Sequence, residues 1–219
     1  MSNLNSSVHI AYNQVKNATH TWVVIAGWSF DGRAGLEISS RSNTLIISYY
    51  DPFELASWCE ENLDDYLTTP YSVLGFSLGA LWLSHNQKLF SSALRRVFIG
   101  IRRSYTQDVI SPVEAALQHN FRQCVAAFHN RCLSMGMRQN QMVLCDPEFI
   151  TKPTLEKGLM YLKSFSFNTR IIRSTDSIIH GMLDKIAPFR ELDFIDTNQL
   201  ILKKKMGHLC LVSLDLLDV

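Results

Sequence analysis

The stretch YSVLGFSLGALWLSHNQKL, residues 71–89, decides the fold of this 219-residue chain. It contains Gly75-Phe76-Ser77-Leu78-Gly79, a G-x-S-x-G pentapeptide, between an apolar run and a run of good helix formers. In that context the pentapeptide predicts a nucleophile elbow, a sharp turn from a strand into a helix with Ser77 exposed at its tip. Glycine suits both flanks because a Cβ there would collide with neighbouring backbone. The alternative is a serine in an ordinary strand-to-helix turn.

Strand and helix patterns alternate on both sides of this stretch. The apolar runs at residues 21–26 (TWVVIA) and 44–49 (TLIISY) predict buried strands. Asp51 and Pro52 are expected to cap and open a helix that continues to about residue 67. We expect further strands at residues 8–12, 96–101, 176–180 and 200–204, and a closing helix at 209–217. This order predicts an α/β fold, a doubly wound and mostly parallel sheet, in one domain spanning residues 1–219.

The strand pattern is interrupted between residues 102 and 167, where we expect an inserted helical lid. Ser111-Pro112-Val113-Glu114 is a capping box that predicts the start of a helix. Its apolar residues recur three and four apart as far as Cys132, and Gly136 is a plausible stop. A second lid helix is predicted at about residues 154–165.

The cysteines and the apolar runs indicate the redox state of the thiols and the kind of protein. The five cysteines are scattered without a C-x-x-C pair, which indicates reduced thiols and no metal site. The first residues lack a basic and an apolar segment, and no apolar run reaches the roughly 18 residues of a membrane span. We therefore expect a cytoplasmic protein without a membrane span or a cofactor.

Seven arginines but only two acids and no lysine lie between residues 91 and 140. This window is either a basic surface for an acidic partner or an ordinary solvated face. Aromatic residues are not interleaved with it as in nucleic-acid platforms, so we do not expect nucleic-acid binding.

A serine nucleophile needs a base, and the base needs an acid that orients it. His208 follows the last predicted strand, where a loop would carry its imidazole over the edge at which Ser77 lies. Asp184 and Asp176 compete as the acid, and Asp184 is favoured because it follows its strand as Ser77 and His208 follow theirs. His180 is expected to pack at the end of that strand. Ser77, Asp184 and His208 also occur in the chain order typical of α/β hydrolases.

These residues carry a family resemblance. The stretch SIIHGMLDKIAP, residues 177–188, resembles the H-G-x-x-D-x-x-x-P segment of α/β hydrolases. With GFSLGA, the AGW turn, the late Gly-His pair and TLEKGLMYLKSF, the chain resembles the pimeloyl-acyl carrier protein methyl ester esterases of biotin synthesis, of the BioG and BioH types. Two departures are Ala26-Gly27, where many members have His-Gly, and Gly100-Ile101-Arg102-Arg103, which replaces Asn-Gly-Thr-Pro. A third is a reduced N-terminus, which is too short for the full set of eight strands.

The resemblance implies a serine carboxylesterase that hydrolyses the methyl ester of pimeloyl-acyl carrier protein through an acyl-enzyme. It implies an oxyanion hole from the backbone N–H groups of Trp28 and Leu78, which both follow strand ends. It also implies arginines that hold the acidic carrier protein, and the candidates are Arg102, Arg103, Arg122, Arg131 and Arg138. An esterase or thioesterase for other acyl substrates, and a non-catalytic binding protein of the same fold, stay open as alternatives.

Overall fold

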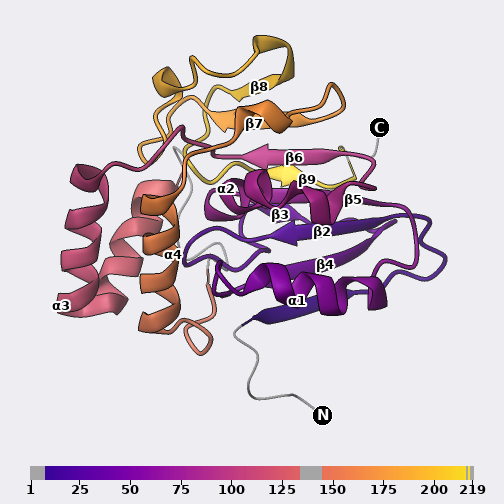
Figure 1. The fold of residues 1–219 in the computed structure, drawn as a ribbon, viewed down its shortest axis with the longest axis horizontal. Helices are drawn as coiled ribbons and strands as arrows, with labels where there is room; N and C mark the ends of the chain where they lie inside the picture. The colour runs from indigo at the N-terminus through magenta and orange to yellow at the C-terminus, as the bar shows by residue number, and fades with distance from the viewer. Residues whose placement is uncertain (1–7, 134–144, 216, 218–219) are drawn as a thin grey trace.

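The computed structural model describes residues 8–133, 145–215 and 217. Within them, seven strands form one sheet in the order β1-β4-β2-β5-β6-β7-β8 (Figure 1). The strands are β1 (His9–Asn13), β2 (Thr21–Ile25), β4 (Asn43–Ser48), β5 (Tyr71–Phe76), β6 (Arg96–Ile99), β7 (Ser177–Gly181) and β8 (Leu200–Lys203). Only β1 runs antiparallel to its neighbour. The predicted doubly wound, mostly parallel sheet is therefore confirmed, and β1 is the antiparallel strand at one edge of it.

Both faces of the sheet are covered, which explains why its inner strands are apolar throughout. Val23 and Ile25 of β2 pack in one core cluster with residues of helices α1 (Leu55–Asn62) and α2 (Leu78–His85). Trp22 and Val24 point to the opposite face and pack in a second cluster. That cluster includes residues of the C-terminal segment that contains β9 (Val212–Ser213), which pairs with β3 (Leu36–Glu37) in a separate two-stranded sheet.

The inserted segment forms two helices, α3 (Gln107–Cys132) and α4 (Lys152–Ser164). Figure 1 shows them next to each other beyond the carboxyl ends of the parallel strands. The ends of the segment meet, because Ser104 and Ser166 form an antiparallel bridge and Phe167 N–H donates to the Arg103 carbonyl at 2.8 Å. The division into one domain with a lid at residues 102–167 stays our interpretation.

Two predicted helix starts are wrong. Helix α1 begins at Leu55, with Glu54 as its N-cap, and Asp51 lies in the turn before it, where its carboxylate accepts Phe53 N–H at 2.9 Å and its carbonyl accepts Leu55 N–H at 3.0 Å. Helix α3 begins at Gln107, ahead of the capping box, so Pro112 lies inside it.

Helix α3 is also not one continuous helix. It is kinked at Asn120, whose φ of −154° and ψ of 96° are not helical. The second half ends at Cys132, and the predicted stop at Gly136 lies outside the described residues.

The predicted closing helix at residues 209–217 is wrong as well. Cys210, Val212 and Leu214 are buried, while Leu211 between them is exposed. This alternation is a strand pattern, and the segment forms β9 against β3. The apolar residues cover the sheet as an extended segment.

Candidate active site

The turn between β5 and α2 has the geometry of a nucleophile elbow. Ser77, between Phe76 and Leu78, has φ of 52° and ψ of −109°, a region that residues other than glycine rarely adopt. A Cβ on Gly75 would lie 2.7 Å from the Ala80 Cα, and one on Gly79 would overlap the Ile25 carbonyl. The two glycines are therefore required by the close approach of strand and helix, as the pentapeptide predicts.

Three side chains from three different loops form a continuous hydrogen-bonded row. His208 Nε2 lies 2.8 Å from Ser77 Oγ, and His208 Nδ1 lies 2.7 Å from Asp184 Oδ2. All three side chains are buried. Each follows a strand at the same edge of the sheet, after β5, β7 and β8 respectively.

The charge on Asp184 sets the tautomer of His208. Burial acts to raise the pKa of Asp184, but the charge and hydrogen bond of His208, with the Ala187 N–H, hold it below its usual value. The ionised carboxylate can only accept, so His208 Nδ1 carries the proton that it donates. His208 Nε2 is then the acceptor for the Ser77 hydroxyl, which is the arrangement that a general base requires.

The competing acid and histidine lie elsewhere. Asp176 lies at the opposite end of β7, where it forms a buried ion pair with Arg96 at 2.5 Å. His180 Nε2–H donates to the Ala187 carbonyl at 2.8 Å and is 3.6 Å from Asp184 Oδ2, so it packs behind the carboxylate, as predicted. Burial lowers the pKa of His180, which keeps this imidazole neutral.

Glycines let the His208 loop reach its partners. A Cβ on Gly100, which has φ of 63°, would lie 3.0 Å from His208 Cε1. A Cβ on Gly207 would lie 2.9 Å from the carbonyl oxygens of Cys132 and Leu133 at the end of α3. The Gly100-Ile101 departure from the family pattern therefore leaves the imidazole its space.

The predicted oxyanion-hole residues lie next to Ser77. Leu78 is the first residue of α2, so its N–H has no acceptor within the helix. Trp28 follows β2 and lines the same cavity as Ser77. A Cβ on Gly27 would lie 2.9 Å from the Phe76 ring, so the two loops are in close contact. The role of the two N–H groups stays a prediction.

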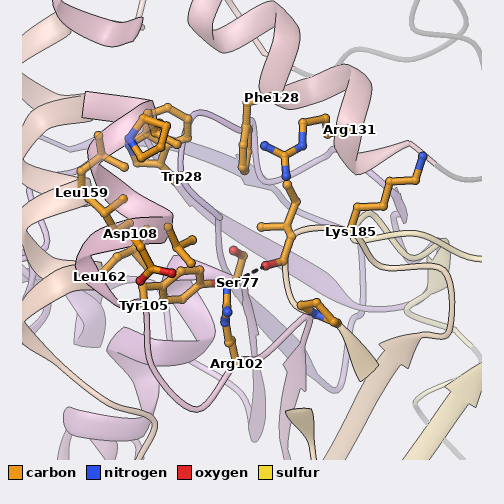
Figure 2. A pocket seen from close by; sticks show the side chains of 16 residues that line it. Trp28, Ser77, Arg102, Tyr105, Asp108, Phe128, Arg131, Leu159, Leu162 and Lys185 are labelled. Carbon is orange, nitrogen blue, oxygen red and sulfur yellow. Dashed lines mark hydrogen bonds between the residues drawn. The ribbon is translucent and has the colours of Figure 1, made fainter. Parts of the chain in front are cut away.

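A cavity of about 320 Å³ opens above Ser77, between the lid helices and the edge of the sheet. Its walls are mainly apolar and come from both lid helices and the loop after β7: Val109, Ile110, Val113, Phe128, Leu159, Leu162 and Ile186. Figure 2 shows Arg131 and Lys185 at one end of the cavity and Asp108 beside Leu162 at another part of its wall. An acyl chain fits such walls, and its polar end would meet the charged groups.

Tyr105 is a site residue that sequence reasoning missed. It is buried beside the nucleophile and lines the same cavity as Ser77 (Figure 2). Burial raises the pKa of Tyr105, so the hydroxyl keeps its proton. The residue lies in the connection from β6 to α3, where the sequence carries no motif that could have indicated it.

The arginine window divides into several different environments. Arg102 pairs with Glu191 at 2.7 Å and Arg103 pairs with Asp193 at 3.1 Å. Arg122 is exposed on α3, and Arg131 lines the cavity, as the paired Arg102 also does. Arg138 lies outside the described residues. Because Arg96 is also paired and buried, the window does not form one basic face across the residues that are described.

No group of three or more His, Cys, Asp or Glu side chains in the described residues could hold a metal ion. None of the described helices is both long enough and apolar enough to cross a membrane.

Comparisons with known proteins give structural matches alone. No protein-family model and no curated protein matches the sequence. An esterase from Exiguobacterium antarcticum superposes with a TM-score of 0.72 at 14% identity, over 92% of this chain and 88% of that one. The chain has the α/β-hydrolase fold.

Two further solved structures share this fold. A bromoperoxidase from Bacillus anthracis superposes with a TM-score of 0.70 at 14% identity, over 92% of this chain and 89% of that one. BioG from Haemophilus influenzae superposes with a TM-score of 0.63 at 13% identity, over 93% of this chain and 94% of that one. At such identities the likeness establishes the α/β-hydrolase fold and leaves the substrate to the site.

Proposed function

We propose that this protein is a serine carboxylesterase with Ser77 as nucleophile, His208 as base and Asp184 as the acid that orients it. The observation that carries the proposal is the row of hydrogen bonds from Ser77 Oγ through His208 to Asp184, at 2.8 and 2.7 Å. The row ends at the floor of an apolar cavity, where an ester carbonyl can approach Ser77.

Acylation follows from this geometry. Ser77 Oγ attacks the ester carbonyl carbon while His208 Nε2 takes the hydroxyl proton. The carbonyl oxygen becomes an oxyanion that accepts hydrogen bonds from the Trp28 and Leu78 N–H groups. The C–O bond to the alcohol then breaks, and the leaving oxygen takes the proton from His208.

Deacylation repeats these steps with water. His208 takes a proton from a water molecule as its oxygen attacks the acyl-enzyme carbonyl. The bond to Ser77 Oγ breaks, Oγ recovers the proton, and the carboxylic acid leaves. Asp184 stays ionised throughout and stabilises the imidazolium that forms in each half-reaction.

For the substrate we propose the methyl ester of pimeloyl-acyl carrier protein. The apolar walls suit an acyl chain, and the likeness to BioG extends over nearly the whole chain. Arg131 and Lys185 at the cavity, with Arg122 on the outer surface of α3, are the groups available to an acidic carrier. Arg102 contributes less, because its guanidinium is mostly buried and paired with Glu191, whereas the pair of Arg103 with Asp193 is exposed and weak.

A second substrate class is supported by a specific observation. The esterase from Exiguobacterium antarcticum superposes more closely than BioG, with a TM-score of 0.72 against 0.63. The pairing of two of the proposed carrier-binding arginines also favours small esters or thioesters that need no carrier.

A fluorophosphonate probe tests the enzyme itself. We expect covalent labelling of the wild type, none of Ser77→Ala, and unchanged labelling of Ser84→Ala. Ser84 is a matched control because it is buried on the same helix and donates to the Leu81 carbonyl. Equal labelling of wild type and Ser77→Ala would leave a non-catalytic binding protein as the better interpretation.

Substrate choice needs a separate experiment. Expression in a biotin auxotroph that lacks its own esterase should restore growth, and purified enzyme should release methanol from pimeloyl-acyl carrier protein methyl ester. Hydrolysis of p-nitrophenyl butyrate without either result would favour the second substrate class.

A further inference from the structure

The loop after β2, residues 26–30, is held in an unfavourable backbone conformation. Ser29 has φ of 64°, which costs a residue with a Cβ roughly 1–2 kcal/mol. Within the loop, Phe30 N–H donates to the Gly27 carbonyl at 3.2 Å. Such a conformation persists only where its surroundings hold it. This loop carries the Trp28 N–H, so whatever holds it also sets the direction of that donor.

Helix α3 holds the loop on one side of Trp28. His129 is fully buried, and its Nε2 lies 3.0 Å from Ser29 Oγ and 3.2 Å from the Ser29 carbonyl oxygen, to which it donates. Its ring stacks on Phe30 with 4.6 Å between centroids. Burial lowers the pKa of His129 to about 4, against the opposing effect of the Ser29 bond, so this contact is made by a neutral imidazole.

Helix α4 holds the Trp28 side chain itself. The indole Nε1–H donates to the Leu155 carbonyl at 2.8 Å, in a buried position. Gly158, one turn further along α4, makes room for the ring, because a Cβ there would lie 2.6 Å from Trp28 Cδ1. Phe128 of α3 meets the indole edge-on with 4.9 Å between centroids. Trp28 and Ser29 are thus each bonded to a different lid helix.

We propose that the lid helices position the oxyanion hole: His129 and Gly158 hold the 26–30 loop so that the Trp28 N–H meets the developing oxyanion. This rests on the proposed esterase function. His129 acts through the loop as a positioning residue, because the base that contacts Ser77 is His208. The lid then has a second role besides lining the acyl cavity.

The expected size of the effect follows from the value of one donor. Losing one oxyanion-hole N–H typically lowers turnover about 10²–10³-fold, and a displacement of about 1 Å removes part of that. We therefore expect His129→Leu to lower kcat roughly 10–100-fold. KM should change little, since the oxyanion forms only in the transition state.

The test compares transition-state and ground-state binding in one variant series. Kinetics of p-nitrophenyl butyrate are measured with inhibition by butylboronic acid, whose tetrahedral adduct on Ser77 occupies the oxyanion hole, and by butyric acid, which fills the acyl cavity. His129→Leu should weaken the boronic acid by the same factor as kcat and leave butyric acid inhibition unchanged. His129→Gln, which keeps a donor, should recover most of the loss. His119→Leu, at an exposed position of α3, should match the wild type.

Gly158→Ala provides a second route to the same answer if His129→Leu does not fold. Its added methyl group displaces the indole and should produce the same split between boronic acid and butyric acid. An unchanged kcat in either folded variant, or an equal loss of affinity for both inhibitors, would overturn the proposal. In those cases, ester hydrolysis by the wild type that is lost in Ser77→Ala would still support the proposed esterase function. A wild type that hydrolyses no ester and binds no fluorophosphonate removes both.

Discussion

Asp184→Asn tests the proposed triad through the hydrogen bonds around one carboxylate. Asp184 Oδ1 accepts N–H bonds from Ile186 and Ala187, each at 2.7 Å, while Oδ2 accepts Nδ1–H of His208. In the variant, the amide oxygen must take the Oδ1 position, because an NH₂ group there would face two donors. The NH₂ group then faces His208 Nδ1 and forces the imidazole proton onto Nε2. In that tautomer His208 cannot accept the proton of Ser77.

The magnitude follows from the two backbone bonds. Restoring the active tautomer requires the amide to flip, which leaves both backbone N–H groups without an acceptor at about 1–3 kcal/mol each. The resulting penalty of about 2–6 kcal/mol corresponds to a fall in kcat of about 30- to 10⁴-fold. Loss of the negative charge that stabilises the imidazolium places the expected value near the upper end of that range.

The assay is kcat for p-nitrophenyl butyrate, with circular dichroism to verify the fold. Asp176→Asn is the matched control, since it changes a buried carboxylate at the other end of the same strand. It should lower the free energy of unfolding by about 3–5 kcal/mol through the Arg96 pair, yet leave kcat of the folded protein nearly unchanged. A folded Asp184→Asn variant with kcat within tenfold of wild type would refute the reasoning.

Three further perturbations have expected outcomes. Tyr105→Phe removes a buried hydroxyl from the cavity beside Ser77 and should lower kcat about 2–10-fold in the same assay. Gly79→Ala places a methyl group against the Ile25 carbonyl and should lower the free energy of unfolding by about 1–3 kcal/mol or more, measured in urea. The pKa of His129 falls from 6.5 to about 4 on folding, so between these pH values the unfolded chain binds a proton that the folded protein does not. The stabilisation by the neutral, buried imidazole is therefore fully present above pH 6.5 and is lost as the pH falls toward 4. Wild type should therefore lose up to about 3 kcal/mol of stability across that window, and His129→Gln should lose less; equal losses would contradict the assignment.

Local patterns were sufficient for the sheet and for the elbow. The strands appear as apolar runs because both faces of a parallel sheet are buried, and this property is carried by each run alone. Gly75 and Gly79 are needed by a turn that is itself local, so the pentapeptide indicated both the turn and Ser77. His208 and Asp184 were found because each follows a strand whose end the sequence marks.

Local patterns failed where a distant contact decides the structure. The C-terminal segment reads as a helix until β3 is available as a partner, and α3 begins before its capping box. Tyr105 has no motif and becomes a site residue only because the lid connection passes over Ser77. The pairing of Arg102 with Glu191 joins the start of the insertion to the segment that follows β7, so the sequence could not separate neutralised arginines from available ones.

By itself, the sequence determined the α/β-hydrolase sheet, the elbow and the candidate residues Ser77, Asp184 and His208. Strand burial and turn geometry are local properties, and the order of the three residues is read directly from the chain. Tertiary structure alone decided how the lid meets the site. The bonds from His129 to Ser29 and from Trp28 to Leu155 cross 100 and 127 residues of chain. They depend on where two helices come to rest above the sheet, and no periodicity within either helix records that position.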